Sequence, residues 1–191
     1  MVRYIYTMLF CSFLIADSYN MQLLGYLSYE QMTSDITGFY QDDREFAVVG
    51  LQNAASFVDI TNPAIPFEVG RISGSNSIWR DLKYWDRHVY IGTEANDGIK
   101  VVSVDDPDNP VLVNTITDVD NSHNIHVDDG YLYIVGADEY DIWIYDLIFP
   151  GTPALIGTWN GEYIHDLDVK NDIGYAMGIY SSTAYIIDLS D

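Results

Sequence analysis

The chain has 191 residues, of which 48% are hydrophobic and 14% aromatic, so it is long enough and apolar enough to bury a core. Its 29 acidic residues outnumber its 8 basic residues, which gives a formal net charge of −21 at pH 7. Binding the phosphates of nucleic acid requires clustered lysine and arginine, so this composition excludes a nucleic-acid-binding protein. The acidity is typical of a well-hydrated surface, and divalent-cation binding is the sharper alternative.

The first residues, 1–18, are predicted to be a signal peptide. Arg3 precedes an apolar stretch, residues 4–16, which is too short to span a membrane and is followed by the polar residues 17–20. The only cysteine, Cys11, lies within this stretch, so removing the signal would leave a chain without thiols or disulfides. We therefore expect a secreted protein, extracellular or at the bacterial cell surface, with no membrane span in the mature chain.

A segment that ends in proline returns at a nearly constant interval. It occupies residues 57–63, 101–107 and 144–150, and a fourth copy begins at residue 186. The three closing prolines are 44 and 43 residues apart, and the fourth copy follows the third by 42 residues. A period in the low forties is the length of one four-stranded propeller blade, so we predict an all-β protein, a β-propeller of about four blade units. The repeat domain spans residues 21–191, with units at approximately 21–73, 77–118, 122–160 and 163–191.

Short apolar runs within each unit are predicted to be strands. They are rich in Val, Ile, Tyr, Leu and Phe and are bounded by Gly, Asn, Asp and Pro, which is the strand pattern. Many are apolar at successive positions, which indicates a sheet that is covered on both faces. The predicted strands include residues 22–27, 46–50, 67–72, 89–92, 111–116, 132–136, 154–159 and 174–178.

The predicted strand at residues 22–27 has the pattern of a strand that comes late in each unit, with Gly25 where Gly70 and Gly157 fall. The chain therefore opens within a unit, and its last unit lacks this strand. Two arrangements follow: a small closed ring in which the two ends complete one blade, or an open arc of a larger propeller. We favour the arc, which would expose an apolar blade face and should aggregate or dimerise.

An ordered series of motifs resembles a known family. The chain from about residue 21 to its end is similar to the secreted bacterial LVIVD-repeat proteins of the choice-of-anchor B type. This resemblance implies a β-propeller within a longer exported protein, often with a C-terminal sorting segment, and no well-established activity. Because the chain ends without such a segment, we expect it to be an N-terminal fragment. The motifs are residues 25–29, 46–50, 55–63, 77–83, 123–127 and 163–166.

Polar residues that recur at one position of the unit are the candidate binding residues. They lie nine and ten residues before the equivalent tyrosines Tyr90, Tyr133 and Tyr175. Equivalent positions in successive blades lie on one ring around the axis, and a ring of polar groups at the central channel could bind a polar ligand. The candidates are Arg80, Asp81, His123, Asn124, His165 and Asp166.

A structural explanation competes with ligand binding at these positions. Asp or Asn at the start of a strand commonly accepts hydrogen bonds from nearby backbone amides, and we favour this explanation for Asp81, Asn124 and Asp166. A turn requires neither arginine nor histidine, so we favour ligand binding for Arg80, His123 and His165.

No catalytic motif is evident, and we predict no catalytic residue, cofactor or metal. The chain has no Gly-x-Ser-x-Gly motif and no phosphate-binding glycine loop, and its two best-placed histidines lack a metal-binding spacing. Trp79, Trp85 and Trp143 could stack on sugars, although core packing is the commoner role.

We therefore predict a non-catalytic module that binds a small polar ligand or a protein partner. The alternative is a hydrolase or metal-dependent enzyme that uses Arg80, His123, His165 and neighbouring carboxylates.

Overall fold

The computed structural model describes residues 21–190, in which every regular element is a β-strand. Each strand pairs antiparallel with the next one in its sheet. Blade 1 contains β1 (Thr33–Gln41), β2 (Arg44–Leu51), β3 (Ala54–Asp59) and β4 (Phe67–Ser73). Blade 2 contains β5 (Arg80–Trp85), β6 (His88–Thr93), β7 (Ile99–Ser103) and β8 (Val111–Ile116). Blade 3 contains β9 (Asn124–Asp128), β10 (Tyr131–Val135), β11 (Ile142–Asp146) and β12 (Ala154–Trp159). Blade 4 contains β13 (Asp166–Lys170), β14 (Ile173–Gly178) and β15 (Thr183–Asp188).

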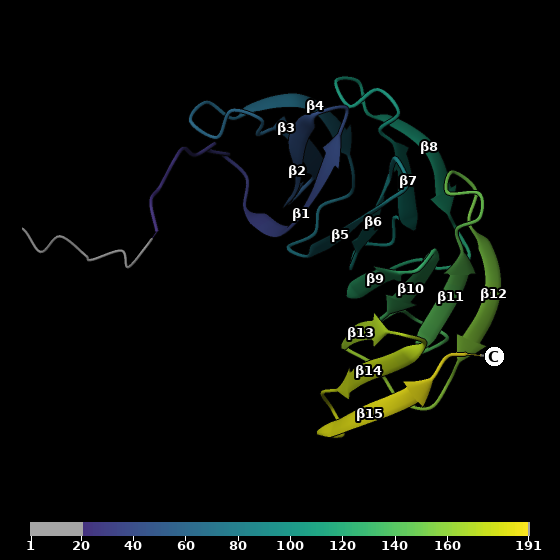
Figure 1. Cartoon of the computed structure of the whole chain (residues 1–191). Coiled ribbons are helices and arrows are strands. Elements are labelled where there is room, and N and C mark those ends of the chain that lie inside the picture. Colours follow the sequence, from purple (N-terminus) through teal and green to yellow (C-terminus); the bar gives the residue numbers. More distant parts are fainter. Residues whose placement is uncertain (1–20, 191) are drawn as a thin grey trace, which may run out of the picture.

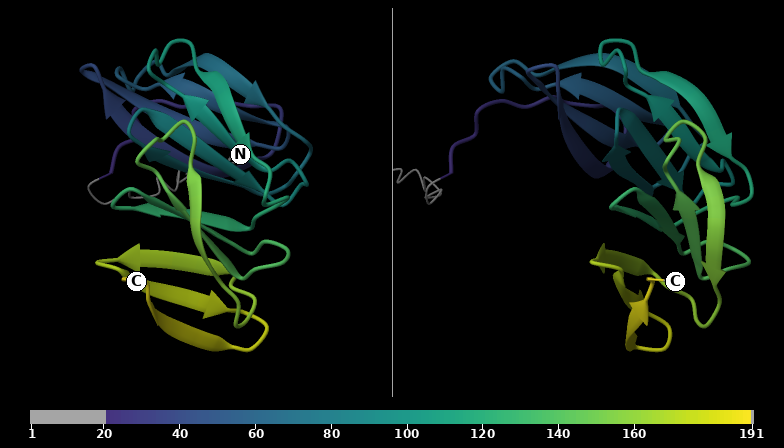
Figure 2. Two further views of the ribbon diagram at one scale, coloured as in Figure 1. Left: turned by 90° about the vertical axis from the view of Figure 1, so that its right-hand side faces the viewer. Right: turned by 45° about the vertical axis from the view of Figure 1, so that its right-hand side comes forward.

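The four blades follow one another along an open arc (Figure 1). The first strand of each blade lies on the inner side, where β5 contacts both β1 and β9, and β9 contacts β13. The outer strands β4, β8 and β12 lie on the convex side, and the first and last blades lie at opposite ends without meeting (Figures 1 and 2). The all-β propeller prediction is confirmed, and the arrangement is the open arc.

Each blade opens with a hairpin made by a two-residue turn. Both central residues of every such turn have positive φ, from 38° to 84°, which is the geometry that matches the right-handed twist of the flanking strands. Asn, Asp and Gly tolerate this region best, which explains the acidic and amide residues at these places. The turns are Asp42-Asp43, Asp86-Arg87, Asp129-Gly130 and Asn171-Asp172.

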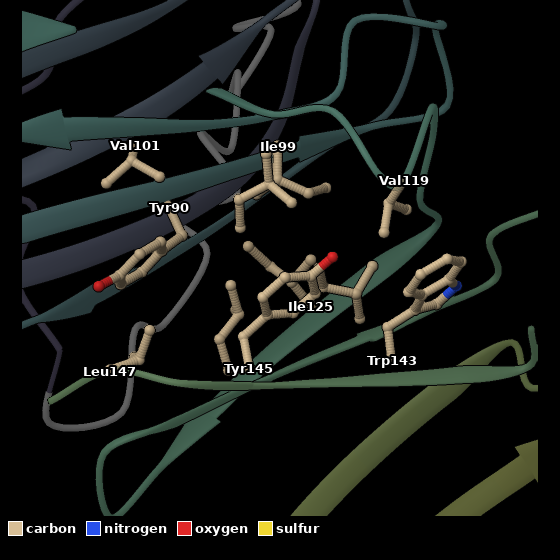
Figure 3. Packing of buried hydrophobic residues seen from close by; sticks show 11 residues of the cluster. Tyr90, Ile99, Val101, Val119, Ile125, Trp143, Tyr145 and Leu147 are labelled. Carbon is tan, nitrogen blue, oxygen red and sulfur yellow. The ribbon is translucent and has the colours of Figure 1, made fainter. Parts of the chain in front are cut away.

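The hydrophobic core lies between the blades. Tyr90 and Val101 of blade 2 pack against Ile125 and Tyr145 of blade 3 in one buried cluster (Figure 3). Similar clusters join blade 1 to blade 2 and blade 3 to blade 4. Because each inner sheet is covered on both faces, its strands are apolar at successive positions, and each large side chain buried there contributes about 1.5–3 kcal/mol.

The predicted strand at residues 22–27 is wrong. Residues 21–29 form an extended segment without strand pairing, which lies against blade 1, with Gly25 beside the carbonyl of Pro63. A strand requires a hydrogen-bonded neighbour, and residues 21–190 provide none at this place. The other predicted strands coincide with strands of the structure.

No helix among residues 21–190 is long and apolar enough to cross a membrane. The predicted signal peptide, residues 1–18, lies outside the described residues.

Candidate functional site

The candidate site lies where the inner strands of blades 2, 3 and 4 begin. The backbone N–H of His123 donates to the carbonyl of Val135 at 3.0 Å, and that of His165 donates to the carbonyl of Met177 at 2.8 Å. These bonds extend the pairing of β9 with β10 and of β13 with β14 by one residue. Both histidines are therefore held at the same edge of the arc by the sheets themselves.

Three aromatic rings from successive blades stack at this edge. The Trp79 indole and the His123 imidazole are nearly parallel, at 5°, with centroids 4.8 Å apart. The His123 and His165 rings follow, with centroids 3.9 Å apart and planes at 38°. Trp79 also donates from Nε1 to the His123 carbonyl, and it is 38% exposed. We call Trp79, His123 and His165 the histidine–tryptophan stack.

Glu94 fixes the orientation of the central ring. Its Oε1 lies 2.7 Å from Nδ1 of His123, and it comes from the loop that follows β6. An ionised carboxylate can only accept, so His123 donates from Nδ1 and keeps Nε2 for another partner.

The surroundings of His165 favour its neutral form by lowering the pKa of the imidazole. Burial lowers its pKa below the ordinary value of 6.5, and the neighbouring His123 lowers it further, while Asp166 and Glu94 act in the opposite direction. A neutral ring can lie against His123 without charge repulsion.

Gly136 makes room for the stack. It has φ of +65°, and a Cβ atom at this position would clash with the Cβ atom of His123 and lie 3.2 Å from the Tyr163 hydroxyl. Tyr163 in turn has its ring centroid 5.0 Å from that of the exposed Tyr180. Aromatic surface therefore continues from the stack into solvent.

Arg80 shares the repeat position of the two histidines, but its side chain is buried in a different place. It is 2% exposed, and its guanidinium donates to the carbonyls of Ala54 at 3.3 Å, Gln52 at 3.4 Å and Ser75. These contacts tie the turn between β2 and β3 to the segment that leads into β5. Arg80 does not reach the histidine–tryptophan stack.

Asp81 and Asn124 are brought together, and they join two blades. Asp81 Oδ2 accepts from the backbone N–H of Ile125 at 2.7 Å and from the Asn124 carboxamide at 2.8 Å. Asp35 Oδ2 makes the equivalent bond one blade earlier, to the backbone N–H of Leu82 at 3.0 Å. A carboxylate of one blade thus accepts from the inner strand of the next, which is a structural role.

The Asp81 carboxyl titrates near neutrality. Burial and the hydrogen bond with Asp35 raise its pKa to about 7, although an ion pair with Lys83 acts in the opposite direction. Asp35 and Asp81 are close enough to share a proton, so the pair carries less than two charges over part of the physiological range.

Asp166 is exposed beside His165, and its Oδ1 accepts from the backbone N–H of Leu167 at 3.1 Å. Residues 21–190 contain no group of three or more His, Cys, Asp or Glu side chains arranged to bind a metal ion. Of the six predicted residues, the structure brings His123 to His165 and Asp81 to Asn124. It leaves Asp166 exposed next to His165, and it buries the Arg80 side chain away from the histidines.

Two members of the site were not predicted as such. Trp79 precedes Arg80 by one residue, so it falls outside the repeat position that identified the histidines. Glu94 comes from a loop and has no counterpart at the same place in the other units. The sequence could have indicated Trp79, because an apolar ring is unusual beside the polar start of a strand. No feature of the sequence indicates Glu94.

Comparison with known proteins supports the fold. No family model and no curated protein sequence matches this chain. The computationally designed protein Ika4 is similar in structure, with a TM-score of 0.63 and 15% identity over 89% of this chain and 99% of Ika4. A 6-phosphogluconolactonase-like protein from Bacteroides uniformis gives a TM-score of 0.55 and 18% identity, covering 78% of this chain and 52% of that one.

The β-propeller domain of Cps50 (Swd1) from Myceliophteria thermophila gives a TM-score of 0.56 and 14% identity, covering 84% of this chain and 55% of that domain. This chain thus spans about half the length of the two natural structures. At these identities the similarity shows the β-propeller fold alone, and the resemblance to LVIVD-repeat proteins stays a prediction.

Proposed function

We propose that this protein is a non-catalytic β-propeller that is exported and acts, at the cell surface or outside the cell, as a ligand-binding module. The observation that carries the proposal is the partly exposed histidine–tryptophan stack, which three blades build at one edge. The β-propeller fold does not itself require an indole or imidazole ring at these three positions. The proposed export rests on the signal-like pattern of residues 1–18 and on the resemblance to secreted LVIVD-repeat proteins.

The chemistry of the site favours a small organic cation as the ligand. The faces of Trp79 and Tyr180 carry the negative part of the ring quadrupole, and Glu94 adds a carboxylate at the same edge. The net charge of −21 draws cations toward the whole surface. Arg80 does not repel such a ligand, because its guanidinium points into blade 1 and donates to backbone carbonyls there.

The alternative is a hydrolase in which His123 acts as a base. The Glu94 to His123 hydrogen bond favours it, since it leaves Nε2 free to accept a proton. Hydrolysis of a chromogenic ester and of a chromogenic glycoside by the purified protein tests it, and turnover that disappears in His123→Ala would replace the binding proposal.

The binding proposal is tested by titrating the purified chain with tetramethylammonium chloride while following tryptophan fluorescence and amide chemical shifts. Sodium chloride at equal ionic strength is the reference. We expect saturable binding in the millimolar range that weakens at least tenfold in Trp79→Leu and His165→Ala. Phe149→Leu, at an exposed aromatic residue of another turn, is the matched control and should bind as the wild type does. Equal responses in all four proteins would overturn the proposal.

A further inference from the structure

The outward face of blade 4 repeats a surface that is buried elsewhere in the arc. Tyr90 and Tyr133 are buried against the following blade, and the equivalent Tyr175 is 44% exposed. Ile186, which pairs with Tyr175, is 77% exposed, and Met177 is 43% exposed. We call Tyr175, Met177 and Ile186 the open face of blade 4.

Blade 1 carries the matching surface at the other end of the arc. A cavity of about 570 Å³ lies between segment 21–29 and blade 1, lined mainly by apolar groups such as Ala47, Val49 and Val58. In the other blades the side that faces the preceding blade is also apolar, and it packs directly against that blade. The cavity marks the place where side chains of a preceding blade would pack.

Segment 21–29 already occupies the position of an outer strand. In blade 1, Gly70 of β4 lies against Pro110 in the proline turn of blade 2, where a Cβ atom would clash. Gly25 lies against the proline turn of blade 1 as well, at the backbone carbonyl of Pro63 and not at Pro66, the repeat equivalent of Pro110. The segment is thus placed as the outer strand of a blade that precedes blade 1.

Blade 4 lacks such a strand among residues 21–190. The third strands β3, β7 and β11 each pair with an outer strand, and β15 pairs with β14 alone. An unpaired edge presents free N–H and C=O groups that can accept another strand. Within one copy, segment 21–29 and β15 lie at opposite ends of the arc (Figures 1 and 2).

We propose that two copies of this chain associate head to tail. The open face of blade 4 in one copy packs on blade 1 of the second copy, and residues 22–27 of the second copy pair with β15. Such a contact is heterologous, so a second contact of the same kind can close a ring.

The internal blades specify the register of the new strand pair. Gly70 lies opposite Phe57 and Gly157 lies opposite Ile144, and both glycines follow a bulge. The residue that corresponds to Phe57 and Ile144 in blade 4 is Ile186, which pairs with Tyr175 as Ile144 pairs with Tyr133. Gly25 of one copy is therefore expected opposite Ile186 of the other.

Asp166 gains a partner in this arrangement. Asp35 and Asp81 each accept from a backbone N–H in the inner strand of the following blade. Asp166 occupies the same place in blade 4, and its carboxylate is exposed. In the proposed pair it faces the inner strand of the second copy, near Ile36.

Oligomeric state is the first test. Analytical ultracentrifugation of the purified chain should show a concentration-dependent two-copy species, strengthened by salt because both copies are acidic. Ile186→Asp, in the open face of blade 4, and Val49→Asp, in the cavity of blade 1, should each give monomers. Phe149→Asp, at an exposed apolar residue away from both surfaces, should associate like the wild type.

Mixing the two variants distinguishes head-to-tail contact from other arrangements. Ile186→Asp keeps an intact blade 1 and Val49→Asp keeps an intact blade 4, so the mixture has one complete interface and should form a one-to-one pair. Two monomers that stay apart after mixing would overturn the proposal. So would a wild type that is monomeric at every concentration.

Disulfide trapping tests the register and the occupant together. By the same alignment Leu27 lies opposite Ala184, since Ile72 lies opposite Ala55. In a Cys11→Ser background, oxidised Leu27→Cys/Ala184→Cys should migrate as a dimer on a non-reducing gel, and Leu27→Cys/Tyr185→Cys, one residue out of register, should not. A monomer-sized crosslinked product would show closure by the chain's own segment and would overturn the proposal. Circular dichroism confirms that each variant is folded.

Discussion

The imidazole rings of His123 and His165 come from neighbouring blades, and their centroids lie 3.9 Å apart. At this distance a proton on one ring disfavours a proton on the other. Their proximity therefore adds to the burial that lowers the pKa of His165.

The first prediction concerns the titration of His165. Its pKa in the folded protein lies below 6.5, so the unfolded chain takes up this proton first as the pH falls. The free energy of unfolding should thus decrease as the pH drops below about 6.5, and this contribution should level off below the folded pKa. NMR titration of the imidazole protons measures it directly.

Substitution of the neighbour provides the control for this prediction. His123→Gln removes the second ring charge and should raise the His165 pKa toward 6.5, whereas His88→Gln, at the start of β6, should leave it unchanged. A His165 pKa that is the same in all three proteins contradicts the coupling of the two rings.

Asp81 should make stability fall as the pH rises. Its pKa is about 7 in the folded protein and near 3.8 when unfolded, so the folded state binds more protons between these values. The contribution is fully present below about pH 4 and is lost as the pH passes through 7. Asp81→Asn should reduce the change in unfolding free energy across this pH range by about 2 kcal/mol, as measured by urea unfolding. The estimate takes about 1.4 kcal/mol for each tenfold change in proton affinity and allows for partial compensation by Asp35.

The matched control is Asp120→Asn, at an exposed aspartate outside this network. It should leave the slope of stability against pH unchanged. A slope that persists in Asp81→Asn would assign the proton to another group.

Arg80 should prove to be a structural residue. Arg80→Met leaves three carbonyls without their donor, at Ala54, Gln52 and Ser75, and should lower the free energy of unfolding by about 2–4 kcal/mol. Arg71→Met, which removes a partly exposed pair with Glu68 and a long cation–π contact with Tyr29, should cost about 1 kcal/mol or less. Similar values for the two variants in urea titrations would mean that the buried hydrogen bonds contribute little.

Gly136→Ala should disturb the histidine–tryptophan stack from behind. The new methyl group meets His123 at a backbone conformation that disfavours side chains, so we expect a loss of about 1–3 kcal/mol and a displaced His123 ring. Gly157→Ala is the control, because the nearest atom to its Cβ would be Ile144 Cδ1, at 3.8 Å. Thermal unfolding and the imidazole chemical shifts measure both effects.

The repeat made most of the fold predictable. Its period gives the number of strands in each sheet, and the apolar runs give most of their positions, because each strand is buried between two blades. Segment 22–27 has the pattern of an outer strand but lacks a paired neighbour, which is a property of the rest of the fold that residues 22–27 do not encode.

The candidate site was only partly predictable. Register alone identifies His123 and His165 as neighbours, since equivalent positions of successive inner strands share an edge. It cannot foresee that the long side chain of Arg80 turns back to the carbonyls of blade 1, or that a loop residue such as Glu94 reaches His123.

The placement of the core between the blades has a consequence for how the molecule opens. Each of the three buried clusters joins two neighbouring sheets. As in other repeat proteins, each interface between neighbouring blades therefore contributes its own term to the total stability. Blades 2 and 3 share two clusters each, and blade 4 shares one and has three strands. In a single, unassociated copy, amide hydrogen exchange should therefore proceed as a gradient, with β13 to β15 losing protection first and the strands of blades 2 and 3 that pack around Ile125 keeping theirs longest.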